Sequence, residues 1–498
     1  MKNERRAGIL LPIFSLPSNY GIGTLGKEAF RFIDFLKEAK QSYWQILPIG
    51  PTSYGDSPYQ SFSTFAGNPY FIDLDKLIEE GLLEEEDVAD LKVENPSYVD
   101  YGYIYETRFD ILRKAYLKGK VSLRKDLDSF VEENAEWVKD YALFMALKEK
   151  YEMKSWLEWP DEAIRLRKPQ ALMEAQEELK EDVEFYEFLQ YLFFEQYATL
   201  KEYAHKNGIQ IIGDVPIYVA LDSADVWANP KEFQLDKENY PECVAGVPPD
   251  YFSEDGQLWG NPLYDWEAMK KNGYQFWIRR IGGAARYYDV IRIDHFRGFQ
   301  QYWAVPYGAK TAKNGKWIDG PSLNFVKILR DWFSNIDFIA EDLGIISEDV
   351  TELLKASGFP GMKVLEFGMG PKEANNHTPH NHEPNSVCYI STHDNSPIMG
   401  WKVTADPKEV RFARKYLGLN WKEGFHNGFI RGGMSSVSNL FVAQIQDYLG
   451  LGEESRINTP GTAEGNWQWR LSKGQLTEEM AEQIAEVTER YGRAPKEK

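Results

Sequence analysis

Short apolar runs of strand length recur along the 498-residue chain, and each run ends in polar or charged residues. The runs span residues 8–12, 43–49, 209–215, 290–296, 337–343, 362–367 and 387–394. Residues 27–40 and 187–205 instead follow a helical period, with Phe30, Ile33 and Leu36 on one stripe of the first segment. Continuous apolar strands that alternate with helices are typical of a parallel sheet covered on both faces.

Carboxylates gather at the downstream ends of these runs, at Asp214, Asp294, Glu341, Asp342 and Asp394. In a (β/α)8 barrel the loops that follow the strands converge and carry the active site. A doubly wound open sheet binds its ligands at the same ends of its strands. The number of runs favours the barrel, with room for an eighth strand that the pattern does not reveal. We therefore predict an α/β fold, a (β/α)8 TIM barrel with large, mainly helical insertions between barrel strands.

The spacing between the first runs is uneven. Residues from about 75 to 205 are charged and helical in pattern, without a clear strand. No linker rich in Pro, Gly or Ser bounds this region, so we expect a helical insertion in a single catalytic domain over residues 1–498. Its acidic stretch at residues 79–90 is typical of a solvated helix face or turn.

Charge narrows the possible partners. The chain has 57 Lys and Arg against 77 Asp and Glu, a net charge of -20. A surface of this sign repels nucleic acid and anionic lipid, so neither is expected as a partner. Aromatic residues are numerous, with 15 Trp, 29 Tyr and 28 Phe. Most aromatic side chains pack in cores, but their flat apolar faces also suit the C–H faces of sugar rings.

Two features of the sequence indicate the cellular compartment of the protein. Only two cysteines occur, Cys243 and Cys388, which argues against a disulfide scaffold. The apolar run near the N-terminus is too short for a signal peptide, and no run of about 18 apolar residues could span a bilayer. We expect a cytoplasmic enzyme.

Asp294 ends an apolar run and is flanked by Arg292, His295 and Arg297. Nearby cations are expected to keep this carboxylate ionised and its pKa low, as a nucleophile at neutral pH requires. A buried structural ion pair is the alternative interpretation of the same segment.

Glu341 and Asp342 end another run as adjacent carboxylates. Because like charges side by side disfavour full ionisation, one of them is suited to act as a general acid. The alternative is a cap for the next helix; we assign capping to Asp342 or a later residue and the chemistry to Glu341. His393 and Asp394 end a third run, where a catalytic dyad, a metal site and a hydrogen-bonded anchor all remain open.

Taken together, the three segments suit glycoside chemistry. Cleavage with retention needs a carboxylate nucleophile and a carboxylic acid about 5 Å apart, together with groups that stabilise an oxocarbenium-like transition state.

Long motifs run in one order through almost the whole chain. They are GIG (21–23), GDSPYQ (55–60), GDVPIYV (213–219), PPDYF (248–252), GQLWGNP (256–262), RIDHFR (292–297), EDLG (341–344), THDN (392–395) and GNWQWR (465–470). In these the chain resembles the amylomaltases, 4-alpha-glucanotransferases of glycoside hydrolase family seventy-seven in the alpha-amylase superclan. One departure is that THDN continues with Ser396-Pro397, where many members of the family have Asp-Thr.

The resemblance implies roles for individual residues. Asp294 would form a β-glucosyl ester, Glu341 would be the acid/base, and Asp394 would hold the 2- and 3-hydroxyls of the sugar. Arg292 would orient Asp294. The other residues implied to bind substrate are His393, Asp214, Tyr59, Trp259, Ser57, His295 and Asn466. Tyr54 and Tyr101 would belong to a second, remote glucan site.

The reaction implied by the resemblance is disproportionation of maltooligosaccharides or other alpha-1,4-glucans, without a cofactor. We expect an aromatic lid loop at about residues 245–262 to exclude water and favour transfer. Three alternatives remain: a glucan hydrolase that uses the same carboxylates, a catalytically silent glucan-binding protein, and a metal-dependent hydrolase that uses His393, Asp394 and Asp294. No metal site is predicted, because the spacing of His377, His380, His382 and Glu383 fits no tight site.

Overall fold

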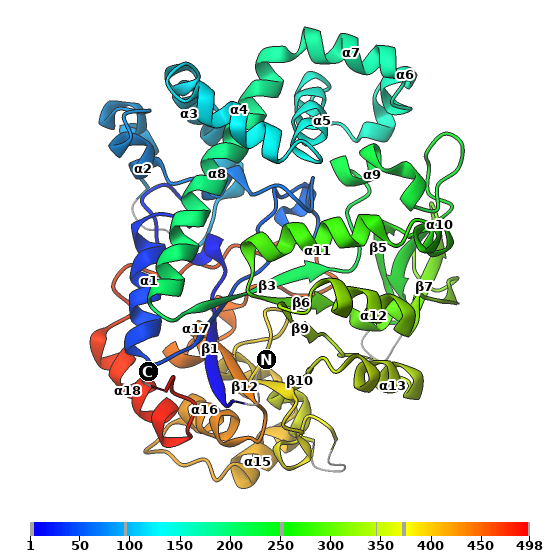
Figure 1. Cartoon of the computed structure of the whole chain (residues 1–498). Coiled ribbons are helices and arrows are strands. Elements are labelled where there is room, and N and C mark those ends of the chain that lie inside the picture. The colour runs from blue at the N-terminus through cyan, green and yellow to red at the C-terminus, as the bar shows by residue number, and fades with distance from the viewer. Residues whose placement is uncertain (1–3, 94–96, 250–252, 345, 371–374, 497–498) are drawn as a thin grey trace.

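Eight parallel strands close into a barrel in the computed structural model, which describes residues 4–93, 97–249, 253–344, 346–370 and 375–496 (Figure 1). Around the barrel the strands follow the order β1, β12, β11, β10, β9, β6, β3 and β2. Their bounds are β1 Arg6–Leu10, β2 Tyr43–Gln45, β3 Gln210–Pro216, β6 Val290–Asp294, β9 Asp337–Ala340, β10 Gly361–Val364, β11 Ser386–Tyr389 and β12 Leu440–Gln444. The predicted TIM barrel is confirmed.

Among the eight barrel strands, the sequence pattern missed only β12. Its apolar run has just four residues, Leu440–Ala443, before Gln444 and the short helix α17 (Ile445–Leu449), so it did not stand out as a strand. The four strands of a second sheet, described below, were not predicted either. Several predicted runs also extend past the observed strands. Residues 46–49, for example, leave the sheet after Gln45, because the chain bends there into the loops at the mouth of the barrel.

Side chains fill the inside of the barrel. The cluster consists of Leu10, Tyr43, Ile212, Val290, Ile339, Met362, Val364, Val387, Tyr389, Leu440 and Val442, all nearly inaccessible to solvent. A packed interior of this kind leaves no room for a ligand inside the barrel. In such barrels ligands bind above the carboxyl ends of the strands.

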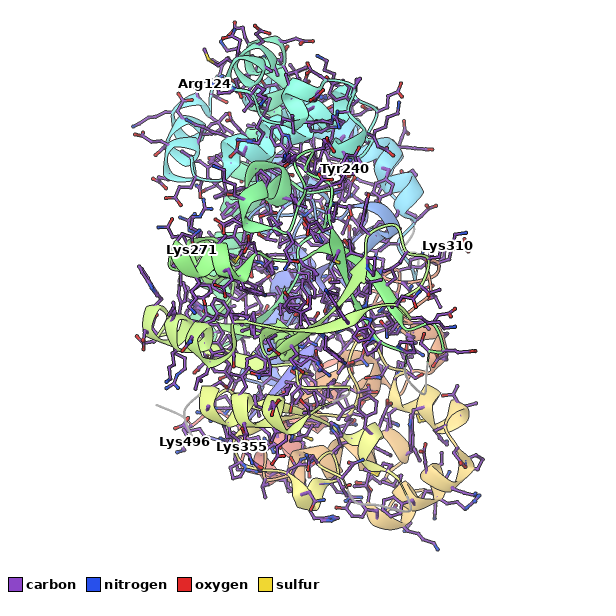
Figure 2. The ribbon with its side chains drawn as sticks, turned by 90° about the vertical axis from the view of Figure 1, so that its right-hand side faces the viewer. Arg124, Tyr240, Lys271, Lys310, Lys355 and Lys496 are labelled. Atoms are coloured by element: carbon purple, nitrogen blue, oxygen red, sulfur yellow. The ribbon has the colours of Figure 1, made fainter. Side chains whose placement is uncertain are left out.

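A helical insertion separates β2 from β3. Its helices are α2 Leu74–Glu79, α3 Tyr101–Gly119, α4 Arg124–Glu133, α5 Val138–Lys150, α6 Glu162–Arg165, α7 Pro169–Glu178 and the long α8 Lys180–Lys206. In Figure 1 these helices form the upper part of the molecule, and α8 descends from them to the barrel beside α1. Figure 2 shows the same end of the molecule at Arg124, far from Lys355 and Lys496.

A buried ion pair ties the insertion to the loop after β3. The side chain of Lys148, on α5, is fully buried, and its Nζ donates to Asp222 Oδ2 at 2.5 Å. The same ammonium also donates to the carbonyl oxygens of Met153 and Lys154. A buried charge needs such a full set of partners, so this contact fixes where the insertion lies.

Further α-helices lie outside this insertion. They are α1 Lys27–Glu38, α9 Ala224–Ala228, α10 Trp266–Lys271, α11 Gln275–Tyr287, α12 Ser322–Trp332, α13 Glu348–Ser357, α14 Ile398–Thr404, α15 Pro407–Tyr416, α16 Phe425–Ser435, α17 and α18 Glu478–Arg490. None of the helices in the described part of the chain is long and apolar enough to cross a membrane.

A second, antiparallel sheet stands beside the barrel. It contains β5 Gln257–Pro262, β4 Cys243–Val247, β7 Gln301–Pro306 and β8 Lys316–Asp319, in that order. The expected lid loop at residues 245–262 therefore begins and ends in the paired strands β4 and β5. Residues 250–252 of that range lie outside the described residues. Whether the range acts as a lid stays a prediction.

Candidate active site

The three carboxylates of the sequence analysis follow three barrel strands at the same end of the barrel. Asp294 is the last residue of β6, Glu341 directly follows β9, and Asp394 lies five residues beyond β11. In the register of β6 with β9, Ile293 is opposite Ala340, so the next residues, Asp294 and Glu341, are level with each other. The structure thus brings the acidic groups together at the mouth of the barrel.

A single guanidinium nitrogen contacts two of the acidic groups. Arg292 Nη1 donates to Asp214 Oδ2 at 2.6 Å and to Asp294 Oδ1 at 3.1 Å. The cross-strand register explains the first contact, because Asp214 on β3 pairs with Arg292 on β6. The side chains of Arg292 and Asp214 are 3% and 0% exposed, whereas that of Asp294 is 29% exposed. Asp294 alone of the three is therefore open to a ligand.

The carboxylate of Asp214 is buried. It has no exposed surface, and its Oδ2 accepts hydrogen bonds from Arg292 and, at 2.9 Å, from the hydroxyl of Tyr59. Direct contact of Asp214 with sugar hydroxyls stays a prediction.

Backbone groups hold Glu341 beside Asp294. His295 N donates to Glu341 Oε2 and Leu343 N donates to Glu341 Oε1, both at 2.7 Å. The Glu341 backbone N donates to Ile293 O at 3.0 Å, and Phe296 N donates to Glu341 O at 3.1 Å. His295 adopts a left-handed conformation with φ 53°, which is uncommon for a residue other than Gly and directs its N–H to the carboxylate.

Burial raises the pKa of both Asp294 and Glu341. Burial raises the pKa of Asp294 well above its usual range, and Asp214, Glu341 and Asp394 add to the rise, while Arg292 opposes it. Burial likewise raises the pKa of Glu341, against Arg292 and two backbone donors. The expectation of a low pKa at Asp294 is therefore wrong, because one guanidinium shared with Asp214 does not offset desolvation and the neighbouring carboxylates.

Tyr59 links Asp214 to His393. Because the Tyr59 hydroxyl donates its proton to Asp214, it accepts from His393 Nε2, at 2.8 Å. Burial raises the pKa of Tyr59 well above 10 and lowers the pKa of His393, so both are neutral at neutral pH. The two rings also stack, with centroids 5.3 Å apart. Ser57 supports this arrangement, since its Oγ accepts from Tyr59 N at 3.2 Å.

Asp394 is held by a loop that the sequence analysis did not identify. Asn458 Nδ2 donates to Asp394 Oδ1 at 2.6 Å, and Arg456 Nη2 donates to Asp394 O at 2.7 Å. His393 Nε2 lies 3.4 Å from the same Oδ1. The departure at Ser396 lies behind this site, where its Oγ accepts from Arg456 Nη1 at 3.2 Å. No periodicity or motif in the sequence marks Arg456 and Asn458, which lie more than 60 positions from Asp394.

Trp259 contributes an aromatic wall to the same region. Its ring meets the His295 ring edge to face, with centroids 4.8 Å apart, and its indole N–H donates to Gln257 Oε1 at 3.1 Å. Burial and the nearby Arg297 lower the pKa of His295 to about 3. His295 is therefore neutral and offers polar and aromatic contacts but no charge.

Two expected residues, Asn466 and Tyr101, have partners within the protein. Asn466 braces its own loop, because its amide donates to Thr462 and accepts from Thr459 N. Tyr101 is only 6% exposed, and its hydroxyl donates to Trp467 O at 3.0 Å. The side chain of Tyr54 lies outside the described residues. Substrate binding by Asn466 and the second glucan site stay predictions.

Asp342 does not cap a helix. Its Oδ1 accepts from Met362 N at 2.6 Å, and its Oδ2 lies 3.9 Å from Lys363 Nζ. Because Met362 and Lys363 belong to β10, Asp342 connects the end of β9 to β10. The N-cap of α13 is a later residue, Ser347.

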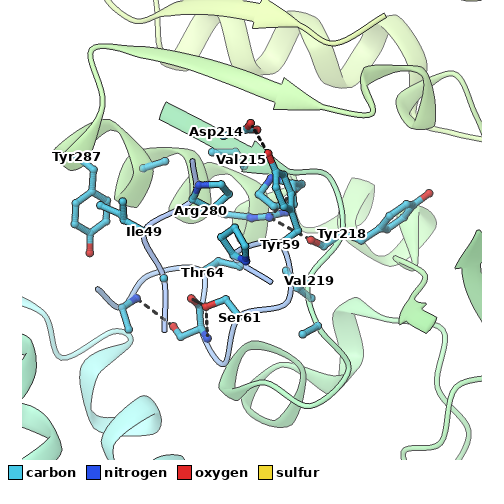
Figure 3. Close-up of a pocket in the computed structure, with 18 of the residues that line it drawn as sticks. Ile49, Tyr59, Ser61, Thr64, Asp214, Val215, Tyr218, Val219, Arg280 and Tyr287 are labelled. Atoms are coloured by element: carbon cyan, nitrogen blue, oxygen red, sulfur yellow. Dashed lines mark hydrogen bonds between the residues drawn. The ribbon is translucent and has the colours of Figure 1, made fainter. Parts of the chain in front are cut away.

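A small cavity lies behind the site, as Figure 3 shows around Tyr59 and Asp214. Its volume is about 50 Å³, enough for a few water molecules but too small for a sugar ring. Arg280 crosses its wall and donates to Ile217 O at 2.9 Å.

The histidines in the segment before β11 have separate partners. His377 Nδ1 accepts from Val364 N, His380 Nδ1 contacts Tyr416 OH, and His382 Nε2 faces His377 O. Within the described residues, no group of three or more His, Cys, Asp and Glu side chains is arranged to hold a metal ion.

Comparisons with known proteins agree with this geometry. A family model described as 4-alpha-glucanotransferase matches residues 11–477. The 4-alpha-glucanotransferase of Clostridium butyricum is 49% identical over 97% of this chain and 99% of its own length. That of Thermus thermophilus is 46% identical over 98% of this chain and 100% of its own.

A solved relative has the same fold. The amylomaltase from Streptococcus agalactiae, in complex with acarbose, superposes with a TM-score of 0.96 and 42% identity over 99% of this chain and 100% of that one. These matches confirm the resemblance found in the motifs. The chain belongs to the 4-alpha-glucanotransferase family.

Proposed function

We propose that the site transfers a segment of an alpha-1,4-glucan to the 4-hydroxyl of an acceptor glucan or glucose by retaining double displacement. In the first step the Asp294 carboxylate attacks the anomeric carbon while Glu341 protonates the glycosidic oxygen. The bond between the anomeric carbon and the glycosidic oxygen breaks, and the leaving glucan departs with the proton. In the second step Glu341 accepts the proton of the acceptor 4-hydroxyl. The acceptor oxygen then attacks the anomeric carbon and displaces Asp294.

The contacts of the two carboxyls support this division of roles. Burial raises the pKa of both carboxyls. Asp294 contacts the guanidinium of Arg292 at 3.1 Å, which stabilises a negative charge on that carboxyl. This contact suits Asp294 to the role of nucleophile, and Glu341 is then the acid of the first step. The anchoring of Glu341 by His295 N is the observation that carries the assignment, because it fixes the acid next to the nucleophile.

Asp394 is proposed to bind the 2- and 3-hydroxyls of the glucosyl unit at the reacting carbon. Its side chain is 41% exposed and faces the site, while its Oδ1 is held by Asn458. Hydrogen bonds to these hydroxyls that strengthen in the transition state favour the distorted sugar. Tyr59, His393 and Trp259 present polar and aromatic groups to the same unit.

Transfer is proposed to prevail over hydrolysis because the hairpin of β4 and β5 covers the acceptor side. Trp259, on β5, stands against His295, the residue that follows the nucleophile. An aromatic wall at this position excludes water and aligns a sugar acceptor. The relative from Streptococcus agalactiae was solved with acarbose, and we propose that this chain binds alpha-glucans in the equivalent cleft.

A cytoplasmic location is proposed as well. It is supported by the scarcity of cysteine and by the absence of a membrane-spanning helix in the described residues. The net charge of -20 makes nucleic acid an unsuitable partner.

Incubation with maltotriose tests the proposal. We expect free glucose together with a ladder of longer oligosaccharides, while the total number of reducing ends stays constant. A steady rise in reducing ends with only shorter products would instead identify a hydrolase. No change in the maltotriose would point to a binding protein or to a different substrate.

A further inference from the structure

The loop after β12 and α17 folds back over the segment that carries Asp394. Asn458 N donates to His393 O at 3.1 Å, and Asn458 Nδ2 donates to Asp394 Oδ1 at 2.6 Å. One residue of this loop thus binds both the backbone before Asp394 and its carboxylate. His393 Nε2 also faces Oδ1, at 3.4 Å. Asn458 thus holds Asp394 by Oδ1, and the partly exposed side chain is left to offer Oδ2 to a ligand.

Arg456 holds the backbone of Asn458 and that of Asp394. Its Nε donates to Asn458 O at 2.8 Å and its Nη2 donates to Asp394 O at 2.7 Å. Its Nη1 reaches Ser396 Oγ at 3.2 Å and Glu453 Oε1 at 3.0 Å. A planar guanidinium with these partners has a fixed orientation. It therefore sets the spacing between the backbone of Asp394 and the backbone of Asn458.

The environment of Asp394 makes such a brace necessary. Asp394 raises the pKa of Asp294, so the two carboxyls lie within electrostatic reach of each other. An unbraced Asp394 would rotate away from the other carboxylates, because like charges repel and its side chain is partly exposed. The neutral amide of Asn458 opposes this rotation without adding a positive charge that would compete with Arg292.

We propose that Asn458 and Arg456 are positioning residues that hold Asp394 by Oδ1 so that Oδ2 meets the hydroxyls of the glucosyl unit. Neither residue needs to touch the substrate. The inference rests on the proposed role of Asp394 and extends it to a loop that none of the motifs includes. Orientation of this kind acts mainly in the transition state, so it supports kcat more than ground-state binding.

Alanine substitution at Asn458 tests the proposal, with Asn427→Ala as the matched control. The side-chain amide of Asn427, on α16, likewise donates to an oxygen, in this case the backbone Glu423 O at 3.0 Å. For Asn458→Ala we expect kcat with maltotriose to fall about 10- to 100-fold and KM to change less than about threefold. The control should keep wild-type values. An Asn458→Ala enzyme with wild-type kcat would overturn the inference.

Asn458→Asp adds a second measurement, the pH dependence of kcat/KM, which should not change if Asn458 only stabilises the loop. It preserves size but sets a second carboxylate against Asp394. Because adjacent carboxylates resist full ionisation, the acidic limb of the kcat/KM profile should move to higher pH. An unshifted profile with undiminished kcat would contradict the proposal even if Asn458→Ala proved unstable.

Asp394→Asn separates the inference from the function on which it rests. If Asp394→Asn abolishes turnover while both Asn458 variants retain it, the positioning role is wrong and the proposed function stands. If Asp394→Asn itself retains turnover, the proposed role of Asp394 fails, and the inference fails with it.

Discussion

The backbone N–H of His295 donates to Glu341 Oε2 at 2.7 Å, so the residue that follows the proposed nucleophile, Asp294, holds the proposed acid. The contact depends on the left-handed conformation of His295. It joins the ends of two barrel strands through one bond, and any shift of Asp294 therefore moves Glu341 with it. A fixed separation between the two carboxyls is what a retaining mechanism requires.

Replacement of Asp294 by Asn should lower kcat by at least about four orders of magnitude, because an amide does not form the glycosyl ester. The melting temperature should stay close to that of the wild type, since the amide still accepts from Arg292. Steady-state release of glucose from maltotriose measures the effect. Retention of a tenth of normal turnover would exclude Asp294 as the nucleophile.

Removal of the Tyr59 hydroxyl should impair the site without unfolding the chain. In Tyr59→Phe, Asp214 loses a donor and His393 loses the acceptor of its Nε2–H. Because both partners are buried, we expect kcat/KM to fall about 10- to 100-fold. Tyr203→Phe is a suitable control, since Tyr203 OH also donates to a carboxylate, Asp34, at 2.6 Å on the outer helices. Equal effects of both substitutions would contradict a specific role for Tyr59.

Arg292→Gln should move the whole pH profile of kcat/KM to higher pH. Arg292 lowers the pKa of Asp294 and that of Glu341, so its loss raises both further. The nucleophile must be ionised and the acid protonated, and hence the acidic and the basic limb both shift upward. Arg292→Lys keeps the charge, and its limbs should stay near their wild-type positions. Unshifted limbs in Arg292→Gln would refute the electrostatic role.

The sequence predicted much of this account because the informative residues lie at strand ends. Asp294, Glu341 and Asp394 each follow an apolar run, and a barrel brings such positions together. Strand β12 was missed because its apolar run is only four residues long before Gln444. Burial was also invisible in the sequence. Asp214 has the same pattern as the catalytic carboxylates but is completely covered in the fold.

The bracing of Asp394 could not be predicted, for a different reason. Arg456 and Asn458 lie in a loop without helical or strand period, and the pairing of β12 with β11 brings that loop to the end of β11. The low pKa expected for Asp294 failed similarly, because desolvation and Asp214 become apparent only in three dimensions. Local sequence identifies candidate groups, whereas their partners depend on tertiary structure.

Asp447 should make the stability of the fold depend on pH. It is completely buried, and burial raises its pKa from 3.8 to about 7, against donors that include Ile398 N and Ser391 Oγ. The contribution of the protonated group to stability is fully present below about pH 4 and is lost as pH rises through about 7. From pH 4 to pH 8, Asp447→Asn should gain on the order of 4 kcal/mol relative to the wild type. Denaturant unfolding at the two values measures this, and a constant difference would contradict the raised pKa.

The most direct test of the mechanism is to trap the glycosyl enzyme in Glu341→Gln. An alpha-maltosyl fluoride donor does not need protonation of its leaving group, so the first step proceeds, whereas the second lacks its base and stalls. Mass spectrometry of the digested protein should then find one maltosyl unit on the peptide that contains Asp294, and none in Glu341→Gln combined with Asp294→Asn. A maltosyl unit on another residue, or a complete absence of labelled peptide, would contradict the assignment of nucleophile and acid.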